Sequence, residues 1–448
     1  MLCPAFSRTY LFTPLSRIRM DPSASYANCQ VSAKLHDPTP HECQEGLSQN
    51  AVQDLDKAVQ DRNNFGWRKI VINFSPAWFS VNMGTGIVSI LLNKFPYPAN
   101  WLYWLSVVVF CLNIVLFFVF LIISIMRYTM YEGIFLVMIR HPVQSFFVGT
   151  FPVGFATIVI MVALVCEPAW GPRAGTLAYA LWWIDVAIAL LCNLWMPFVV
   201  MRVHHSDISR MTAVWLLPVV STVVAAACGG IVAAHLPDHR ALITIITSYI
   251  LFGTGFPLAL VILVMYFHRL TIFHLPPREI IVSAFLPLGL LAQGAFVPMQ
   301  LGKIALKVFP AEKTLDPTAG RLFYNVGILS GLIFYGYSLV WLFFAVASIS
   351  LSKFPFNMGW WGFTFPVGVF GLAAITFGQD LPSKFFKVLG TIISVITILL
   401  WLGISLETTR RSITGELFTA PCVPQYLAAR AARREAKKHD EVGENKEV

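Results

Sequence analysis

The stretch Phe151-Pro152-Val153-Gly154 recurs unchanged as Phe365-Pro366-Val367-Gly368, and weaker copies at Leu217-Pro218 and Leu286-Pro287 lie between them. A helix breaker that returns at a nearly regular spacing indicates one structural unit used several times. Because proline removes a backbone hydrogen bond and usually bends a membrane helix, five such helices could bend about one axis and enclose a pore. The prolines concerned, one near the start of every second apolar segment, are Pro76, Pro152, Pro218, Pro287 and Pro366.

The composition of the 448 residues assigns the chain to the integral membrane proteins. Hydrophobic residues make up 57% of the chain, charged residues only 12%, and the mean hydropathy is +0.69. Ten apolar segments each hold the roughly 20 residues that a membrane-spanning helix needs. Nine contain no Asp, Glu, Lys, Arg or His, and of these residues the tenth, between Arg173 and Arg202, contains only Asp185. Lipid offers no partners to backbone groups, so we predict an all-α polytopic membrane protein with ten transmembrane helices.

The ten segments alternate in character. The odd-numbered segments carry the repeat prolines and many small residues, as in Asn82-Met83-Gly84-Thr85-Gly86. Small residues let membrane helices approach closely. The even-numbered segments are longer and richer in aliphatic and aromatic residues, which suits contact with lipid. We therefore predict five helical hairpins, with an inner ring of five proline-bent helices around a central pore and an outer ring of five.

The charge distribution divides the chain into three parts. Residues 1–65 are polar and lack helical periodicity, so we expect a disordered N-terminal tail. Residues 66–410 form the predicted ten-helix transmembrane domain, and residues 411–448 form a basic C-terminal tail. Most of the basic residues behind the net charge of +9 lie in the two tails, which favours a cytoplasmic location for both rather than nucleic-acid binding. The short loops alone do not orient the chain.

The predicted inner helices contain no Lys, Arg, His, Asp or Glu. A fixed cation in the path would hold an anion tightly, whereas conduction requires sites weak enough to release it. Neutral donors suit a small oxyanion, although the same hydroxyl and amide groups could simply bond neighbouring helices. The polar residues that we predict to line the pore are Asn82, Thr85, Thr150, Ser221, Gln293 and Thr364.

Two aromatic residues are candidates for a gate. Phe151 and Phe365 each directly precede a repeat proline, where the backbone is restricted. If the bends face the axis, the two rings would plug the path and gate it by dewetting. The alternative is that both rings are ordinary packing residues.

Four ionisable residues at or within the spans have two interpretations each. Arg127, Arg140 and His141 lie at the predicted inner mouth, where they could attract anions or only anchor the helix ends. Asp185 is the sole ionisable residue well inside a span, and such residues are often functional. Asp185 could couple transport to protons, or it could form a hydrogen bond between helices.

Several motifs resemble, in order along the chain, those of the tellurite-resistance/dicarboxylate transporter family, to which the slow anion channels are related. Arg127-Tyr128, His141-Pro142 and Gly149-Thr150-Phe151-Pro152 look like its signature across the second and third spans. Trp360-Trp361-Gly362-Phe363-Thr364-Phe365-Pro366 resembles its ninth-span motif, and residues 73–87 are most similar to the fungal sulfite exporters of the family. The resemblance covers about residues 65–410 and excludes both tails.

The resemblance implies five helical hairpins around a central pore and a homotrimer with one pore in each protomer. It also implies a phenylalanine gate on the ninth helix, which we assign to Phe365 with Phe363 as the competing choice. The implied activity is export of sulfite across the plasma membrane. Because relatives include malate permeases, a proton-coupled malate or dicarboxylate permease is the alternative. The inner helices lack the second cation that a dicarboxylate would call for, which favours the smaller anion.

Other functional classes fit the sequence less well. A membrane enzyme would need His, Glu, Asp or Cys gathered at lipid depth, and the eight cysteines lack the paired spacing of a zinc or disulfide framework. We therefore expect no enzymatic activity, no metal and no cofactor. A non-transporting membrane scaffold is a remote alternative that would leave the repeated helices without a use. The expected partners are sulfite or a related small anion, membrane lipid and further copies of the chain.

Overall fold

The computed structural model describes residues 66–204, 207–351 and 353–431. The predicted disordered tail, residues 1–65, and the end of the basic tail, residues 432–448, lie outside the described residues. Within the described part, nine helices are long and apolar enough to cross a membrane, or ten if the bent pair Trp67–Asn73 and Pro76–Asn93 forms one span. The all-α polytopic fold predicted from the sequence is therefore confirmed.

The long helices fall into a buried set and an exposed set that alternate along the chain. The buried helices are α4 (Phe79–Asn93), α7 (Thr150–Met161), α10 (Leu216–Ala233), α12 (Leu286–Glu312) and α14 (Thr364–Asp380). The exposed helices are α5 (Asn100–Met130), α9 (Pro172–Val203), α11 (Asp238–Phe273), α13 (Ala319–Ser350) and α15 (Lys384–Thr414). Shorter helices are α3 (Trp67–Asn73), α6 (Ile134–Arg140) and α8 (Glu167–Trp170).

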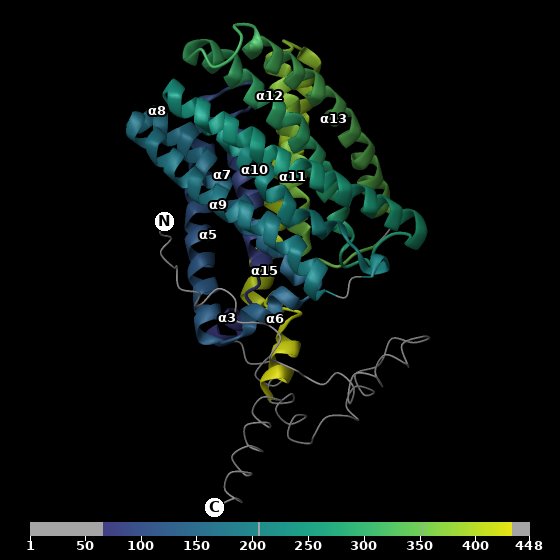
Figure 1. The fold of residues 1–448 in the computed structure, drawn as a ribbon. Helices are drawn as coiled ribbons and strands as arrows, with labels where there is room; N and C mark the ends of the chain where they lie inside the picture. Colours follow the sequence, from purple (N-terminus) through teal and green to yellow (C-terminus); the bar gives the residue numbers. More distant parts are fainter. Residues whose placement is uncertain (1–65, 205–206, 352, 432–448) are drawn as a thin grey trace, which may run out of the picture. The chain divides into compact units, whose positions relative to one another are not determined.

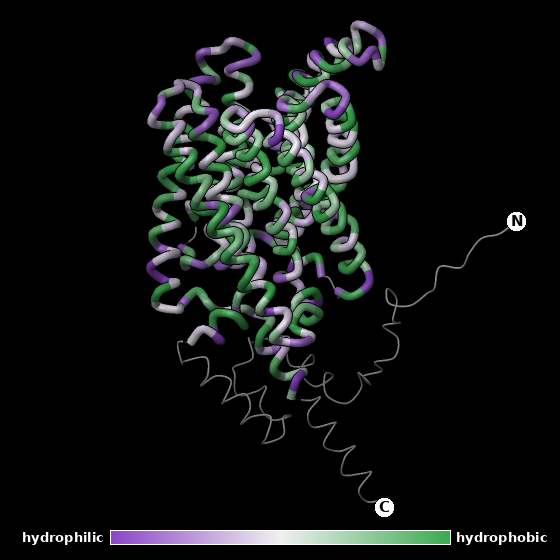
Figure 2. The backbone as a smooth tube through the Cα atoms, turned by 90° about the vertical axis from the view of Figure 1, so that its left-hand side faces the viewer, coloured by the Kyte–Doolittle hydropathy of each residue, from purple (hydrophilic) through white to green (hydrophobic). Residues whose placement is uncertain are grey.

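Burial separates the two sets sharply. The apolar stretch of the span Ala213–Ala233, which contains α10, is 100% buried, whereas that of α5 is only 28% buried. The exposed residues of α5 are nevertheless apolar, as expected for a surface that faces lipid rather than water. Figure 2 shows the same pattern, with hydrophobic residues along the middle of the helices and hydrophilic residues gathered near their ends.

Each buried helix packs against the next buried helix in the chain. α4 contacts α7, α7 contacts α10, α10 contacts α12, α12 contacts α14, and α14 contacts α4. Each buried helix also contacts the exposed helix that follows it, and Figure 1 shows α9 and α11 beside α10. Glycines permit the closest approaches. A Cβ on Gly149 would lie 2.5 Å from the Leu217 carbonyl oxygen, and one on Gly289 would lie 2.9 Å from Pro366 Cα.

The repeat prolines stand at the beginnings of the buried helices. A short 3₁₀ turn leads into each helix, and the five turns are η2 (Pro76–Trp78), η3 (Gln144–Gly149), η6 (Ala213–Trp215), η7 (Ile281–Phe285) and η8 (Met358–Gly362). Pro152, Pro218, Pro287 and Pro366 lie in the first turn of the α-helix that follows, and Pro76 opens its 3₁₀ turn. A proline is tolerated there because the first N–H groups of a helix have no intrahelical partner. Where the sequence predicted a bend inside each helix, the structure has a change from 3₁₀ to α geometry. The sharp bend of 90° lies between α3 and the turn at Pro76.

The compact unit continues past the predicted end of the transmembrane domain. Among the described residues it extends to Tyr426, so it includes residues beyond 410. After α15 the chain turns at Gly415, which has a φ of 77°, and then buries Leu417, Phe418 and Cys422. The Phe418 ring stacks on Trp78 with a centroid distance of 5.0 Å. Apolar side chains after the last span therefore pack back onto the helices, and we call residues 415–426 the C-terminal segment.

Candidate functional site

A cavity of about 590 Å³ lies where the five buried helices begin, and we call it the N-terminal cavity. Every one of the five 3₁₀ turns and the first turn of every buried helix contributes to its wall. The helix N-termini that surround the cavity carry a partial positive charge from the aligned peptide dipoles. Residues that line it from the five helices in turn include Ser80, Met83, Thr150, Leu217, Leu286 and Phe365.

A second cavity, of about 370 Å³, lies toward the other ends of the same helices, and we call it the C-terminal cavity. The last turns of α4, α10 and α14 line it, together with the middle of α12 and the π-helical continuation of α7, Val162–Cys166. Its lining residues include Ile90, Lys94, Leu164, Ile231, Phe296, Gln300, Lys303, Lys307, Leu372 and Thr376.

Tightly packed side chains separate the two cavities. On α14 the lining residues nearest each other are Pro366 and Leu372, which at the helical rise lie about 9 Å apart. The helices between them have little free space, since a Cβ on Gly368 would lie 2.5 Å from Cγ1 of Ile87. The two cavities are therefore lined by the same buried helices, and a short packed region separates them.

The three phenylalanines predicted as gate residues lie in different surroundings. Phe365 is buried, lines the N-terminal cavity next to Pro366, and has no ring contact with another described aromatic residue. Phe151 points into an aromatic group, 4.9 Å from Phe79 and 5.4 Å from Phe117 between ring centroids. Phe363 packs edge-on against Phe285 at 4.8 Å. Of the three, Phe365 is the one that faces a cavity described here.

The six predicted polar residues are all buried, and Thr150 is the one among them that lines either cavity. Its hydroxyl donates to the Pro76 carbonyl oxygen at 2.8 Å and also reaches the Phe147 carbonyl oxygen. The Asn82 amide donates to Asn113 Oδ1 at 2.9 Å, and the Asn113 amide donates to the Thr157 hydroxyl. This chain of amides and hydroxyls joins α4, α5 and α7.

Three of the other four predicted polar residues form hydrogen bonds with a neighbouring helix or with the turn before their own helix. Thr85 accepts a hydrogen bond from the Trp401 indole at 3.1 Å, and Ser221 donates to the Ala189 carbonyl oxygen at 3.2 Å. Thr364 donates to the Trp361 carbonyl oxygen at 2.9 Å. Gln293 is buried, and its Oε1 has no partner among the described residues.

The three basic residues predicted at the inner mouth do not gather in one place. Arg140 is exposed. Arg127 is fully buried at the end of α5, where it donates to the Phe74 carbonyl oxygen at 2.7 Å and to Cys422 Sγ at 3.3 Å. Arg127 therefore ties α5 to α3 and to the C-terminal segment. His141 is the member of the set that lines the N-terminal cavity.

His141 is held as a neutral imidazole by its surroundings. Its Nδ1 accepts from the backbone N–H groups of Val143 and Gln144, each at 3.2 Å. A ring nitrogen that accepts a hydrogen bond carries no proton, and the proton of the neutral ring then sits on Nε2. Burial lowers the pKa of His141, and the charge of the neighbouring His204 lowers it further. His141 therefore offers the cavity a neutral donor, not a fixed cation.

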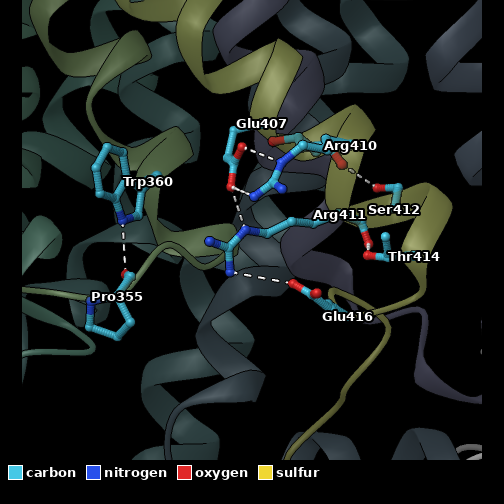
Figure 3. Close-up of polar contacts among 9 residues, drawn as sticks. Pro355, Trp360, Glu407, Arg410, Arg411, Ser412, Thr414 and Glu416 are labelled. Atoms are coloured by element: carbon cyan, nitrogen blue, oxygen red, sulfur yellow. Dashed lines mark hydrogen bonds and ion pairs between the residues drawn. The ribbon is translucent and has the colours of Figure 1, made fainter.

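A network of charged residues at the rim of the N-terminal cavity was missed by the sequence analysis. Figure 3 shows Glu407 on α15 between Arg410 and Arg411, and Arg411 beside Glu416 of the C-terminal segment. Arg411 Nε lies 2.6 Å from Glu407 Oε1, and Arg411 Nη1 lies 3.5 Å from Glu416 Oε2. Arg411 and Glu416 line the cavity, so the guanidinium there is paired with two carboxylates.

Asp185 lies on the exposed helix α9 but is itself fully buried. Neither carboxylate oxygen has a hydrogen-bond partner among the described residues, and Asp185 lines neither cavity. The expected hydrogen bond between helices is therefore not present among those residues.

The family model described as SLAC1, voltage-dependent anion channel, matches residues 73–409 of the chain. This chain is a member of that family. The SLAC1 family match covers all the buried helices and the C-terminal cavity, and it covers the N-terminal cavity except for the part of its wall that follows residue 409. It confirms the resemblance found in the sequence. The match also indicates that the chain is a transport protein and not an enzyme.

Individual SLAC1 family relatives are close enough to align over most of the chain. The sulfite efflux pump SSU1 of Arthroderma benhamiae is 48% identical over 78% of this chain and 93% of that protein. The sulfite efflux pump SSU1 of Trichophyton rubrum is 49% identical over the same shares. A more distant relative, the malic acid transport protein of Schizosaccharomyces pombe, is 24% identical over 77% of this chain and 80% of that protein.

Proposed function

We propose that this protein exports sulfite, or a closely related small oxyanion, across the plasma membrane. The observation that carries this proposal is the near-half identity to two proteins named as sulfite efflux pumps, over almost the full length of those proteins. The buried helices belong to the aligned region, and their stretches between the two cavities offer neutral groups instead of fixed charges. A path without a fixed cation suits an anion that must be released again.

We propose that the five buried helices form a closed inner ring and that the transport path runs through it, with five hairpins in all. The cyclic contacts, from α4 through α7, α10, α12 and α14 back to α4, support this arrangement. The two cavities at opposite ends of the same helices support a continuous path that is closed in this conformation. The path would open when the packed region between Pro366 and Leu372 rearranges.

Phe365 is the gate in this proposal. It lies at the inner end of the N-terminal cavity, beside the packed region, and an apolar ring at a narrow point excludes water and ions. Phe151 and Phe363 are weaker candidates because each is held in an aromatic contact and lines neither cavity. Thr150 and His141 supply polar groups to the cavity that the gate closes, while Asn82, Thr85, Ser221, Gln293 and Thr364 stay candidates for the opened path.

The remaining parts of the proposal concern placement and assembly. Both termini lie in the cytoplasm, so the N-terminal cavity faces the cytoplasm and the C-terminal cavity faces outward. The protein forms a homotrimer with one path in each protomer. Cross-linking in native membranes, followed by mass measurement, tests the trimer, and protease protection of a tag placed at each terminus tests the orientation.

Flux of labelled sulfite in proteoliposomes tests the proposed function directly. Liposomes with the purified protein should release sulfite faster than empty liposomes, and excess malate should compete weakly. Strong competition by malate, with malate flux of its own, would favour the dicarboxylate permease instead. If no anion flux is measured, the non-transporting scaffold is the remaining hypothesis.

The proton-coupled permease has one observation in its favour, which is the buried and unpartnered carboxyl of Asp185. Burying an unpaired carboxylate is costly, and such a group inside a span often serves proton transfer. If it couples transport, Asp185→Asn should abolish the dependence of flux on the proton gradient. Because Asp185 lines neither cavity, we expect the dependence of sulfite flux on the gradient to be the same in the variant and the native protein.

A further inference from the structure

Lys94 occupies an unusual position for a lysine in this protein. It follows the last residue of α4, lines the C-terminal cavity and is partly buried. Within the described residues it has no ion-pair partner and no side-chain hydrogen bond. The two other lysines of the cavity are paired, because Lys303 Nζ lies 2.7 Å from Asp380 Oδ1 and Lys307 Nζ lies 3.8 Å from Asp238 Oδ1. The positive charge of Lys94 is therefore uncompensated.

The C-terminal cavity needs such a charge if anions are to pass through it. The last turns of α4, α10 and α14 line the cavity, and helix C-termini carry a partial negative charge. An anion that leaves the packed region would be repelled by these carbonyl groups. A cation at the end of α4 reverses the local field at the point where the repulsion would be strongest.

Other hydrogen-bond donors line the same cavity. Gln300 and Lys303 lie three residues apart along α12, so they share one face of the helix. Gln379 of α14 lies on the wall as well. The Lys303 ammonium has three N–H donors and uses one for Asp380, which leaves two for another acceptor. The cavity thus offers several donors around one unpaired ammonium group.

We propose that Lys94 and Lys303 together bind a small oxyanion at the C-terminal cavity, the last site that the anion occupies before release. The inference rests on the proposed function and assigns the exit site of that transport path. Sulfite fits because its three oxygens can accept from both ammonium groups and from an amide at once. Burial lowers the pKa of Lys94, as does the charge of Lys303 nearby, and a bound anion between the two would reverse the second effect.

A purely structural role for Lys94 makes a different prediction. A cation at a helix C-terminus stabilises the helix through its dipole. If Lys94 only does this, its replacement lowers thermal stability and leaves the concentration dependence of transport unchanged. If it binds the anion, the concentration dependence changes on one face of the membrane.

Sulfite currents in excised membrane patches separate these two roles, because each face can be exposed to sulfite in turn. Lys94→Gln should raise the half-saturating sulfite concentration about tenfold at the face of the C-terminal cavity, the effect of losing one charge-assisted hydrogen bond. The value at the other face should stay near that of the native protein. Lys307→Gln is the matched control, since this lysine lines the same cavity but is well exposed and weakly paired. Its value should change by less than about twofold, because exposed charges are screened.

Chemical restoration of the charge provides a second test that does not depend on one variant. Lys94→Cys should show the same weakened half-saturation, and a cationic methanethiosulfonate reagent should bring it back toward the native value. An anionic reagent of similar size should weaken it further. The native protein treated in parallel controls for its own cysteines, of which Cys111 is exposed. Equal effects of the two reagents would contradict an electrostatic anion site.

The outcomes also distinguish this inference from the proposed function. If the native protein carries sulfite and Lys94→Gln has native half-saturation at both faces, the exit site is wrong while the export function stands. If the native protein carries no sulfite, the proposed function fails and the exit site fails with it. Lys94→Arg keeps the charge, so its half-saturating sulfite concentration should lie closer to the native value than that of Lys94→Gln. This result would show that misfolding does not cause the effect of Lys94→Gln.

Discussion

The two cavities lie at opposite ends of the same five buried helices, and the charged groups that line them differ. At the N-terminal cavity the helix beginnings supply partial positive charge, His141 is neutral, and the one lining guanidinium, Arg411, is paired with carboxylates. At the C-terminal cavity the helix ends supply partial negative charge, and an unpaired Lys94 lies among them. One end attracts anions through backbone dipoles, and the other end needs a side-chain cation to do so.

The buried helices carry no Lys, Arg, His, Asp or Glu between the two cavities, which agrees with this contrast. Peptide dipoles at one end and a lysine at the other attract the anion to the mouths without holding it in the middle. An anion that binds weakly along the path and moderately at its ends can both enter the path and leave it, as conduction requires. The region between the cavities then needs only an apolar barrier that can open.

The largest effect is expected at that barrier. Phe365→Ala removes the ring at the inner end of the N-terminal cavity and should raise sulfite flux by about tenfold or more, which corresponds to a barrier lower by about 1.4 kcal/mol. The measurement is initial flux in proteoliposomes of equal protein content. A rate near that of the native protein would show that the barrier lies elsewhere, and the two cavities would then not be divided at Phe365.

Phe151→Ala is the matched control for this prediction. Phe151 also precedes a repeat proline, but its ring packs on Phe79 and Phe117 and lines neither cavity. Its removal should lower stability through the lost aromatic packing and leave the flux per folded molecule close to native. Equal activation by both variants would mean that loosening any inner helix opens the path.

A second prediction concerns the packing of the helix ends around each cavity. A Cβ on Gly289, near the N-terminal cavity, would lie 2.9 Å from Pro366 Cα, which belongs to the backbone of α14. A Cβ on Gly230, near the C-terminal cavity, would lie 3.0 Å from Cγ of Gln300, whose long side chain can move into the cavity. Gly289→Ala should therefore cost about 1–3 kcal/mol of stability through overpacking, whereas Gly230→Ala should cost less.

Thermal unfolding in detergent, followed by intrinsic fluorescence, measures the difference. Gly253→Ala is the control for the effect of adding a methyl group without overpacking, because a Cβ on Gly253 would have no other atom within 4 Å. Similar melting temperatures for Gly289→Ala and Gly230→Ala would show that the N-terminal ends of the helices are no more rigid than the opposite ends. That result would contradict the tighter helix packing expected around the N-terminal cavity.

The sequence predicted the membrane helices well because lipid imposes a simple rule on length and polarity. Ten apolar windows of sufficient length gave nine spanning helices and one bent pair. The alternation of small and large residues likewise predicted which helices are buried. The meaning of the prolines was harder to predict, because a proline in the first turn of a helix and one in its middle look the same in a sequence. In the structure a 3₁₀ turn precedes each buried α-helix, so the repeat prolines lie at the helix starts and not in the helix middles.

The surroundings of the charged residues could not be predicted, because their partners are distant in the chain. Anchoring of a helix end was one of the two interpretations of Arg127, but its partners Phe74 and Cys422 are 53 and 295 residues away and could not be predicted. Lys94 marks the end of an apolar window, yet its lack of a carboxylate partner depends on α12 and α14. The C-terminal segment had a local signal, because Leu417 and Phe418 are apolar residues in a supposedly polar tail.

The smallest expected effect tests whether the N-terminal cavity is free of a titrating cation. The pKa of His141 is lowered by burial and by His204, so as pH falls below the ordinary range of histidine the unfolded chain takes up a proton before the folded protein does. Proton binding to the unfolded state lowers stability with falling pH, because the folded Nδ1 must keep accepting from Val143 and Gln144. His141→Asn should therefore lose less melting temperature between pH 7 and pH 5 than the native protein, by about 1–3 °C. His268→Asn, at an exposed position on α11, is the control for a general effect of acid. A native protein whose stability rises toward pH 5 through His141 would mean that the ring becomes cationic in the cavity, and the contrast in charge between the two cavities would disappear.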